Sequence, residues 1–363
     1  MTKVQFMWNH VQDLYVDPIS EQFSTELWDL SKIYNIKEAT VLSNVKVIKS
    51  LEQLDNNLKE IGKKDKVCVV TNIQYADLGT IYSVLKKNKV IIVGIVKDTH
   101  GTALLQRGRL KYFKYLDYRG RIFSIFPSLQ QRLRELKYGK NPYDYSMAGA
   151  NYYPSQAKHF LKIHQIKYDE YLRAKESENI IKNKYILFVD AGPTVHPMYL
   201  NKKNSLSHEL YLKMMCSYFD RIESNTNCEV VISGHPKGQY TEKEWNGRKI
   251  FYGKTADLIH HSEGVVSHFS TSLVNSILEY KPTQIVYSDE LLKSCFQDTM
   301  IMGLELGHLC KMDVCDLDSP HKWDMTVDKD AYDKYLSEEI INEQFKDKSN
   351  GELICDYLKE ITS

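Results

Sequence analysis

The sequence of 363 residues contains no apolar run of the roughly 18 residues that a membrane-spanning helix needs. Its start, MTKVQFMWNHVQDLYVD, lacks the apolar segment of a secretory signal. The seven cysteines show no CxxC spacing, and their odd number without an export signal predicts reduced thiols in a cytoplasmic protein. The formal net charge of +1 gives no general attraction to nucleic acid, so we expect no such partner.

Several catalytic motifs are also missing. There is no GxxxxGK[ST] loop and no GxGxxG after the first predicted strand, which argues against NTPases and dinucleotide-dependent oxidoreductases. The absence of GxSxG argues against an α/β-hydrolase. No Cys or His pairs have the spacing of a structural zinc site, and no DxD follows a predicted strand. We therefore expect no metal and no other cofactor.

Short apolar runs alternate with helical patterns, which predicts βαβ units and parallel sheets. In the first half the predicted strands are KVQFMW, ATVLSN, KVCVVTN and VIIVGIV, with helices at EQFSTELWDLSKIY, VIKSLEQLDNNLKEIGKK and DLGTIYSVLKKN. YGKNPYDYSMAGANYYPSQ is predicted as loop and residues 155–184 as a charged helix. The alternation restarts at KYILFVDAGP, becomes irregular after residue 290, and ends in helices near 328–344 and 352–361. We expect an α/β protein with two Rossmann-like domains, 1–165 and 166–363, and a C-terminal helical segment.

Three polar loops follow predicted strands of the second half, within residues 184–288. They are Asp190-Ala191-Gly192-Pro193, Ser233-Gly234-His235-Pro236-Lys237-Gly238 and Ser267-His268-Phe269-Ser270-Thr271-Ser272. Ligands of doubly wound sheets bind beyond such strand ends. The third loop opens a helix, whose hydroxyls and free backbone N–H groups form an anion site, although helix capping alone would also use a Ser or Thr.

His235 strengthens the prediction of a phosphate site. Pro236 fixes the backbone after the histidine, so that the imidazole can donate to a phosphate oxygen. Lys237 adds a positive charge. A histidine in an ordinary turn is the alternative, but two polar loops at the same edge of one sheet favour phosphate binding.

The order of strand-Asp, strand-SGHPKG and strand-SHFSTS-helix resembles the donor domain of GT-B glycosyltransferases that use CMP-activated sugars. Bacterial sialyltransferases, polysialyltransferases and Kdo transferases share a His-Pro motif and a later Ser/Thr pair. The resemblance covers about 100 residues. It implies that Gly234, His235, Pro236 and Lys237, together with Ser270, Thr271 and Ser272, contact the donor's nucleotide and phosphate.

The catalytic carboxylate has two candidates. Asp190 ends the first strand of the second domain, as a strand-end aspartate does in the Kdo transferases, and the Asp-Asp-Gly of the sialyltransferases is missing. Asp98, with His100 in the same loop, follows an apolar strand of the first domain. Turn formation is the simpler role for each aspartate. His10 is a further candidate for contacting the acceptor.

A basic and aromatic stretch begins at Arg107 and Arg109 and continues to Arg121. Such a face could bind an anionic glycan acceptor or lie peripherally on the inner face of the cell membrane, although a solvated helix face is more common. This stretch is the only basis for expecting a membrane contact.

Together, these features predict a glycosyltransferase of bacterial capsule or lipopolysaccharide synthesis. Its donor would be a CMP-activated 2-keto sugar acid, Kdo or a sialic-like nonulosonate, and its acceptor a glycan or glycolipid. A UDP- or GDP-sugar or a polyol-phosphate donor is the alternative, in which Glu279 would contact a ribose. A non-catalytic nucleotide- or sugar-binding protein is the third hypothesis.

Overall fold

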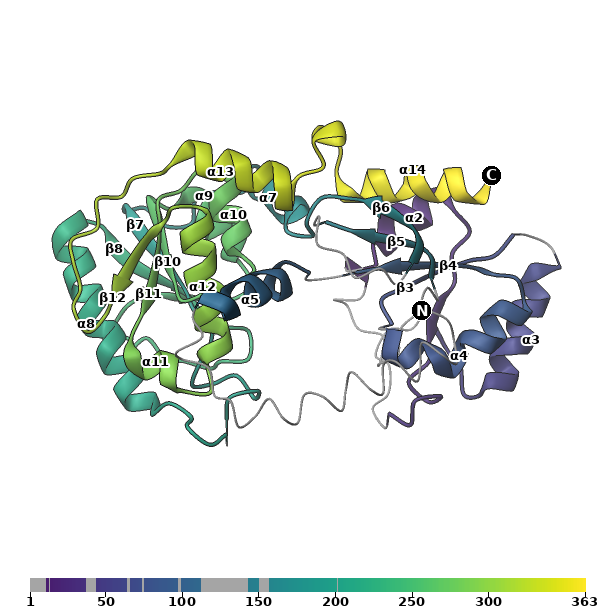
Figure 1. Cartoon of the computed structure of the whole chain (residues 1–363), viewed down its shortest axis with the longest axis horizontal. Coiled ribbons are helices and arrows are strands. Elements are labelled where there is room, and N and C mark those ends of the chain that lie inside the picture. The colour runs from purple at the N-terminus through teal and green to yellow at the C-terminus, as the bar shows by residue number, and fades with distance from the viewer. Residues whose placement is uncertain are drawn as a thin grey trace. The chain divides into compact units, whose positions relative to one another are not determined.

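The computed structural model describes residues 11–12, 14–36, 44–63, 66–73, 75–96, 99–111, 143–149, 157–200 and 202–363 (Figure 1). The chain forms two compact units. Unit 1 comprises Met1–Thr99, Tyr118–Ile166 and Ile341–Ser363, and unit 2 comprises His100–Asp117 and Lys167–Ile340. The change of unit after Ile166 lies beside the predicted boundary. However, the predicted division into 1–165 and 166–363 differs from the two units at two places. Ile341–Ser363 belongs to unit 1, and His100–Asp117 belongs to unit 2.

Unit 2 contains a six-stranded parallel sheet in the order β12-β11-β10-β7-β8-β9. Its strands are β7 (Tyr185–Val189), β8 (Glu229–Ser233), β9 (Ile250–Phe251), β10 (Gly264–Ser267), β11 (Thr283–Tyr287) and β12 (Asp313–Asp316). The first strand lies in the middle, and the chain builds outward from it first to one side and then to the other. This is the strand order of a Rossmann sheet, with its topological switch point between β7 and β10.

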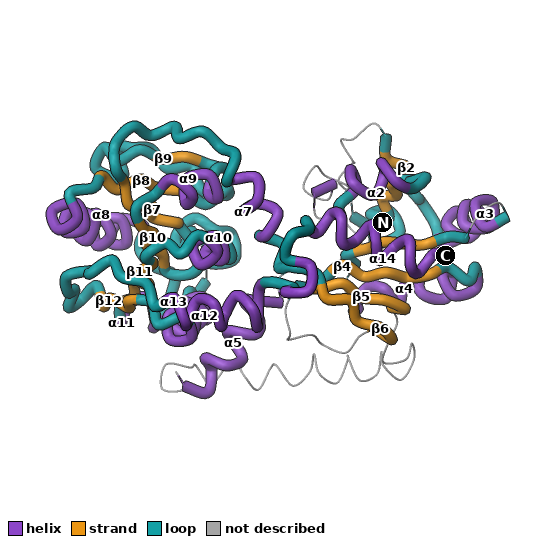
Figure 2. Tube along the Cα trace, turned by 90° about the horizontal axis from the view of Figure 1, so that it is seen from above, coloured by secondary structure: helices purple, strands orange, loops and turns teal. Residues whose placement is uncertain are grey.

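Helices flank this sheet. They are α5 (Thr99–Lys111), α7 (Tyr168–Ala174), α8 (His208–Thr226), α9 (Thr255–His261), α10 (Leu273–Leu278), α11 (Asp289–Lys293), α12 (Gln297–Leu309), α13 (Lys329–Tyr335) and a π-helical turn (Leu336–Ile340). Figure 2 shows α8 on one side of the strands and α9 and α10 on the other. Helix α8 begins with a serine cap, because the side chain of Ser207 accepts from Leu210 N.

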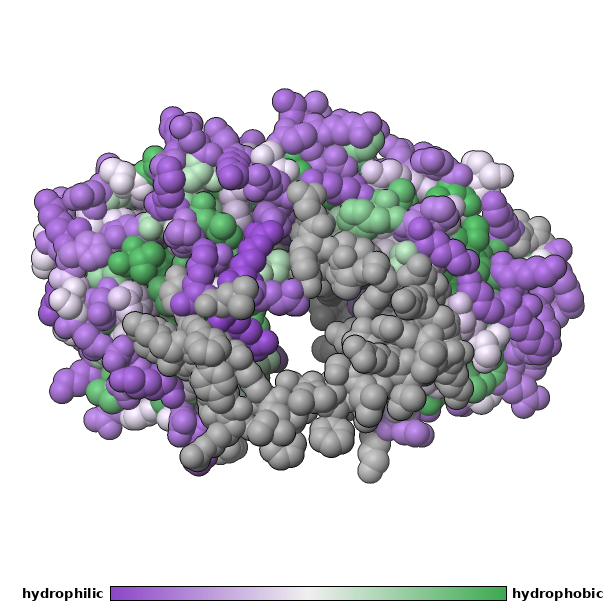
Figure 3. All heavy atoms as spheres, viewed as in Figure 1, coloured by the Kyte–Doolittle hydropathy of each residue, from purple (hydrophilic) through white to green (hydrophobic). Residues whose placement is uncertain are grey.

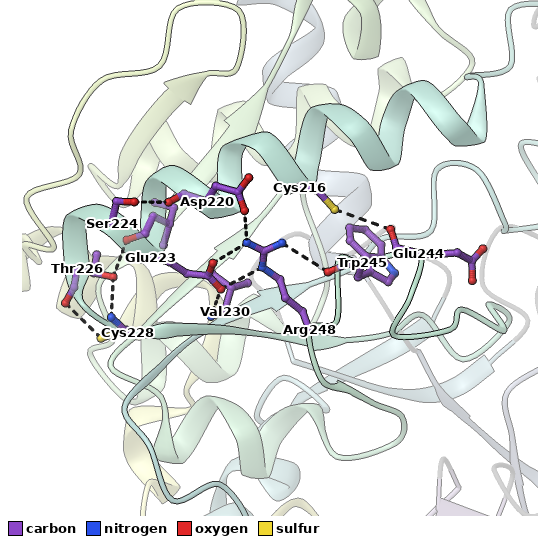
Figure 4. A network of polar contacts seen from close by, with 11 residues as sticks. Cys216, Asp220, Glu223, Ser224, Thr226, Cys228, Val230, Glu244, Trp245 and Arg248 are labelled. Atoms are coloured by element: carbon purple, nitrogen blue, oxygen red, sulfur yellow. Dashed lines mark hydrogen bonds and ion pairs between the residues drawn. The ribbon is translucent and has the colours of Figure 1, made fainter.

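An arginine joins α8 to the segment before β9 (Figure 4). The Arg248 side chain is 7% exposed and donates to Glu223 at 2.6 Å and to Asp220 at 2.6 Å. Glu223 also accepts from the backbone N of Val230 in β8. The adjacent Trp245 is fully buried against Phe188 and Phe219. This network holds the return from β8 to β9 against the helix.

Unit 1 holds two parallel sheets, β1-β2 and β3-β4-β5-β6. Its elements are α2 (Val16–Gln22), β1 (Leu27–Asp29), β2 (Val45–Val47), α3 (Leu51–Gly62), β3 (Cys68–Thr71), α4 (Tyr75–Lys87), β4 (Ile91–Ile95), β5 (Tyr143–Ala148), β6 (Ala157–Lys162), a 3₁₀ turn (Glu343–Phe345) and α14 (Asn350–Thr362). The α/β class, the two units with parallel sheets and the C-terminal helices are confirmed. Two such units are the components of the predicted GT-B fold.

Several predicted elements are wrong. The helix over EQFSTELWDLSKIY is interrupted, since Leu27–Asp29 pairs with β2 as a strand. The predicted loop contains β5, and the predicted charged helix contains β6 and the short α7. The supposedly irregular chain after residue 290 contains α11, α12 and β12. Because most of α12 is buried, it lacks the apolar stripe that reveals an amphipathic helix.

The surface on the face shown in Figure 3 is largely hydrophilic where it is described, with small hydrophobic patches between the polar residues. Within the described part of the chain, no helix is long and apolar enough to cross a membrane.

Candidate functional site

Three loops leave one edge of the unit 2 sheet at the same level. In the strand register, Val189 of β7 lies beside Ser233 of β8 on one side and beside Ser267 of β10 on the other. The segments that begin at Asp190, Gly234 and His268 therefore start next to one another, beyond the carboxyl ends of their strands. Because β7 lies between β8 and β10, the Asp190 loop is central and the two predicted phosphate loops flank it.

Asp190 connects the central loop to the loop after β8. Its side chain is 4% exposed; Oδ1 accepts from Gly192 N at 2.9 Å, and Oδ2 accepts from His235 N at 3.4 Å. Gly192 has a φ of 64°, and a Cβ there would lie 3.0 Å from the His235 ring. Burial raises the pKa of the Asp190 carboxyl. The structure thus gives Asp190 a positioning role, and its predicted catalytic role stays a prediction.

His235 is held in a tight turn after β8. Its Nδ1 accepts from Lys237 N at 3.2 Å, and its carbonyl accepts from Gly238 N at 2.8 Å. Pro236, which lies between His235 and Lys237, has no backbone N–H that would need a hydrogen-bond partner. A neutral imidazole whose Nδ1 accepts a hydrogen bond carries its proton on Nε2. His235 therefore presents an Nε2–H donor.

A second His-Pro pair, which the sequence analysis missed, stands opposite the first. His196, followed by Pro197, lies in the loop after β7, and its Nδ1 accepts from Met198 N at 3.0 Å. This repeats the contact of His235 with the residue two positions later, so His196 likewise carries its proton on Nε2. The two rings meet edge to face at 4.9 Å. The repeated His-Pro dipeptide was the signal available in the sequence.

Lys237 completes a cluster of donors. Its Nζ lies 3.2 Å from His196 Nε2, so an ammonium group faces an N–H group in the tautomer that accepts from Met198 N. In the other tautomer, Nε2 accepts from Lys237 and the Met198 contact is lost. Among the described residues, no ion pair joins Lys237, His196 or His235 to a carboxylate. Three donors without an acidic partner form a site for an anion. We call His196, His235 and Lys237 the donor cluster.

Electrostatics keep both histidines of the donor cluster neutral without a ligand. Burial, followed by the nearby His196 and Lys237, lowers the pKa of His235. Burial and then Lys237 lower the pKa of His196. A bound anion would offset the positive charge of Lys237 and would therefore raise the pKa of His196 and of His235.

The Ser270-Thr271-Ser272 segment stands on the other side of the Asp190 loop. Ser270 Oγ accepts from Ser272 N at 3.2 Å, while Ser272, the N-cap of α10, makes no side-chain cap. All three residues are half-buried. Helix α12 packs directly against this loop, because a Cβ on Gly303 would lie 1.9 Å from the carbonyl oxygen of His268. The phosphate role of these hydroxyls stays a prediction.

Three other predicted contacts have internal partners. Glu279 pairs with His260 at 2.8 Å, at the end of α10 remote from the Ser/Thr loop, so it is not brought to the ligand edge as a ribose contact. Arg107 pairs with Glu339 at 2.6 Å and Arg109 with Asp298 at 3.1 Å. These ion pairs anchor α5 within unit 2 and reduce the support for an acceptor contact.

The remaining candidates cannot be placed. Asp98 and His10 lie outside the described residues, and His100 lies in α5 without a described side chain. In the described ranges, no group of three or more His, Cys, Asp or Glu side chains could hold a metal ion. The expectation of metal-independent chemistry stays a prediction.

Neither a family model nor a curated protein matches the sequence. Among solved structures, the chain is similar to Phytolacca americana UGT2 complexed with UDP-2-fluoro-glucose and pterostilbene, at 10% identity, over 99% of this chain and 92% of that chain, with a TM-score of 0.47. It is also similar to the UDP-GlcNAc 2-epimerase from Methanocaldococcus jannaschii, at 11% identity, over 96% of each chain, with a TM-score of 0.48. At these identities and TM-scores, the likenesses assign no activity and no ligand to the chain.

Proposed function

We propose that the chain is a glycosyltransferase and that unit 2 binds the phosphate of its nucleotide-sugar donor at the donor cluster. The contact that carries the proposal is the 3.2 Å approach of Lys237 Nζ to His196 Nε2. An acceptor placed beside both nitrogens can bind to each of them, and a phosphate oxygen is a strong acceptor. The cluster also stands at the carboxyl edge of a Rossmann sheet, where ligands of such sheets bind.

We further propose that the donor is a CMP-activated 2-keto sugar acid. A CMP donor contains one phosphate, and one compact cluster of donors is sufficient to bind it. The His-Pro and Ser/Thr motifs that resemble those of CMP-sugar transferases support the same choice. The bond between the anomeric carbon and the phosphate oxygen would break as an acceptor hydroxyl attacks and gives its proton to a carboxylate base, for which Asp98 is a predicted candidate. Nε2–H groups and the Lys237 ammonium would stabilise the departing phosphate.

A thermal-shift panel of CMP, CDP, UDP and GDP on the full-length protein tests the donor. A ligand at 100 times its Kd stabilises the native state by about 2.7 kcal/mol. We expect CMP to raise the melting temperature and Lys237→Ala to remove most of the effect. Stabilisation by UDP but not by CMP would exclude the CMP donor and leave the phosphate site intact.

Activity needs a separate measurement. CMP release from CMP-Kdo and from CMP-sialic acid, with and without a glycan acceptor, distinguishes a transferase from a binding protein. Acceptor-dependent release supports the proposal. Tight CMP binding without release from either donor under any acceptor tested would favour a binding protein.

A further inference from the structure

A buried histidine joins the end of β6 to the C-terminal segment (Ile341–Ser363) of unit 1. His164 follows β6 and is 0% exposed. Its Nε2 lies 3.1 Å from the carbonyl oxygen of Phe345, and its Nδ1 lies 3.1 Å from the backbone N of Asn342. Both partners belong to the C-terminal segment, which returns to unit 1 after the chain has built unit 2. The ring therefore connects two parts of unit 1 that are far apart in the sequence.

The two backbone partners fix the proton on this ring. The carbonyl oxygen of Phe345 can only accept, so His164 Nε2 carries a proton. The backbone N–H of Asn342 can only donate, so Nδ1 presents a lone pair. His164 is therefore the neutral Nε2–H tautomer. A second proton would bind at Nδ1 and would face the N–H of Asn342, so the contact with Asn342 would be lost.

Two asparagines close the same junction. Asn350 is 0% exposed; its Oδ1 accepts from His164 N at 2.8 Å, and its Nδ2 donates to the carbonyl oxygen of His164 at 3.2 Å. Asn342 Nδ2 donates to the carbonyl oxygen of Lys162 at 2.7 Å. The C-terminal segment is thus held at the end of β6 by the histidine ring and by these amide contacts.

The surroundings of the ring oppose a second proton. Burial lowers the pKa of His164, and the cationic Lys162 acts in the same direction, whereas the backbone contacts with Phe345 and Lys348 act against them. Further titratable or charged side chains at this junction are the Tyr15 hydroxyl, which accepts from Asn350, the Tyr357 hydroxyl, which donates to the carbonyl oxygen of Lys162, and the ammonium group of Lys348, which pairs with Asp356.

We propose that His164 is an acid-sensitive latch, which holds the C-terminal segment on unit 1 while the ring is neutral and releases it when a second proton binds at Nδ1. Ile166 and Ile341, where the chain leaves unit 1 and returns to it, lie close in sequence to His164 and Asn342. Release would therefore detach α14 and the return connection from unit 2. The proposal does not depend on which ligand the donor cluster binds.

Hydrogen exchange of the full-length protein tests the latch. The opening constant of α14 is the exchange rate of its amides divided by their intrinsic rate at the same pH. In the open form His164 is in water, with a pKa of about 6.5, whereas its pKa in the closed form is lower. The open form thus binds the extra proton, so the stability from the latch is complete above about pH 6.5 and is lost as the pH falls below that value.

His164→Gln provides the comparison, because glutamine does not titrate and its oxygen can accept from Asn342. The opening constant of the wild-type protein, divided by that of His164→Gln, should rise by up to about tenfold per pH unit below pH 6.5. The exposed His159→Gln in β6 is the matched control and should keep the wild-type pH dependence. A ratio that is constant, or that falls on acidification, would overturn the proposal.

The wild-type protein gives a second measurement, which holds even if His164→Gln does not fold. Long-range ¹H–¹⁵N spectra of the folded protein should show His164 protonated on Nε2 alone from pH 8 to pH 6. The opening constant of α3, which does not include this junction, should stay unchanged in the same range while that of α14 rises below pH 6.5. A His164 ring protonated on Nδ1 at pH 7, or equal changes in α3 and α14, would contradict the latch.

Discussion

His196 and His235 meet edge to face at 4.9 Å, and each accepts at Nδ1 from the backbone N–H two residues later. In each ring Nε2 is the nitrogen that this backbone contact does not use, and Lys237 Nζ lies 3.2 Å from Nε2 of His196. The two His-Pro pairs lie in the loops that follow neighbouring strands, β7 and β8, and the folded loop after β7 returns His196 to His235. The following predictions test the site and the structure that supports it.

Removal of the ammonium group should weaken anion binding. A hydrogen bond to a charged group contributes about 1.5–3 kcal/mol, so Lys237→Ala should raise the Kd for CMP by roughly 10- to 100-fold. Isothermal titration of the full-length protein measures the change. Lys203→Ala removes an exposed lysine from the loop after β7, which also carries His196, and should leave the Kd unchanged. Equal losses in the two variants would indicate only a general charge effect.

Anion binding should become tighter as pH falls. Both histidines have lowered pKa values in the free protein, and a bound dianion raises them, so binding takes up protons. Sulfate is the suitable probe because its own charge is constant between pH 5.5 and 8. We expect its affinity to rise on acidification and His196→Gln to reduce this dependence. Affinity that falls with acidification would contradict binding of the anion beside these two histidines.

Gly303→Ala should disturb the Ser/Thr loop. The added Cβ would meet the carbonyl oxygen of His268 at 1.9 Å, so α12 or the loop must shift. Overpacking of this kind typically costs about 1–3 kcal/mol in the free energy of unfolding. Gly62→Ala is the matched control, because nothing lies within 4 Å of a Cβ there. Unfolding with urea should separate the two variants, and an unaffected Gly303→Ala would argue against the close packing.

Arg248→Ala should destabilise unit 2. The side chain is 7% exposed and pairs with Glu223 and Asp220, and breaking a buried pair costs about 3 kcal/mol. Lys249→Ala removes the neighbouring exposed pair with Glu229 and should cost about 0.5 kcal/mol. A comparison of their unfolding midpoints tests whether the network in Figure 4 supports the β8–β9 connection.

The sequence predicted the strands that form short apolar runs followed by polar loops. The apolar strands β7, β8 and β10, which the three polar loops follow, lie where the pattern placed them. Helix α12 was missed because most of its surface is buried, and β5 because Tyr143–Ala148 stands among residues typical of loops. Tyr143–Ala148 forms a strand because it pairs with β4 and β6, and the local amino-acid composition does not show this pairing.

The candidate site was predicted in part. The strand-end loops follow from the alternation of elements, and the structure brings them to one edge. His196 was missed because it lies seven residues beyond β7, where only the folded loop returns it to His235. The burial of Asp190, at 4% exposure, comes from tertiary packing that the sequence of its own loop does not record.

The central claim is that the donor cluster binds the phosphate of a nucleotide. Isothermal titration of CMP into the wild-type protein and into His235→Gln tests it most directly. We predict saturable binding at one site per chain and a loss of at least tenfold in affinity in the variant. Binding of equal affinity in the two proteins, or no CMP binding to the wild type at any concentration up to the millimolar range, would contradict the account.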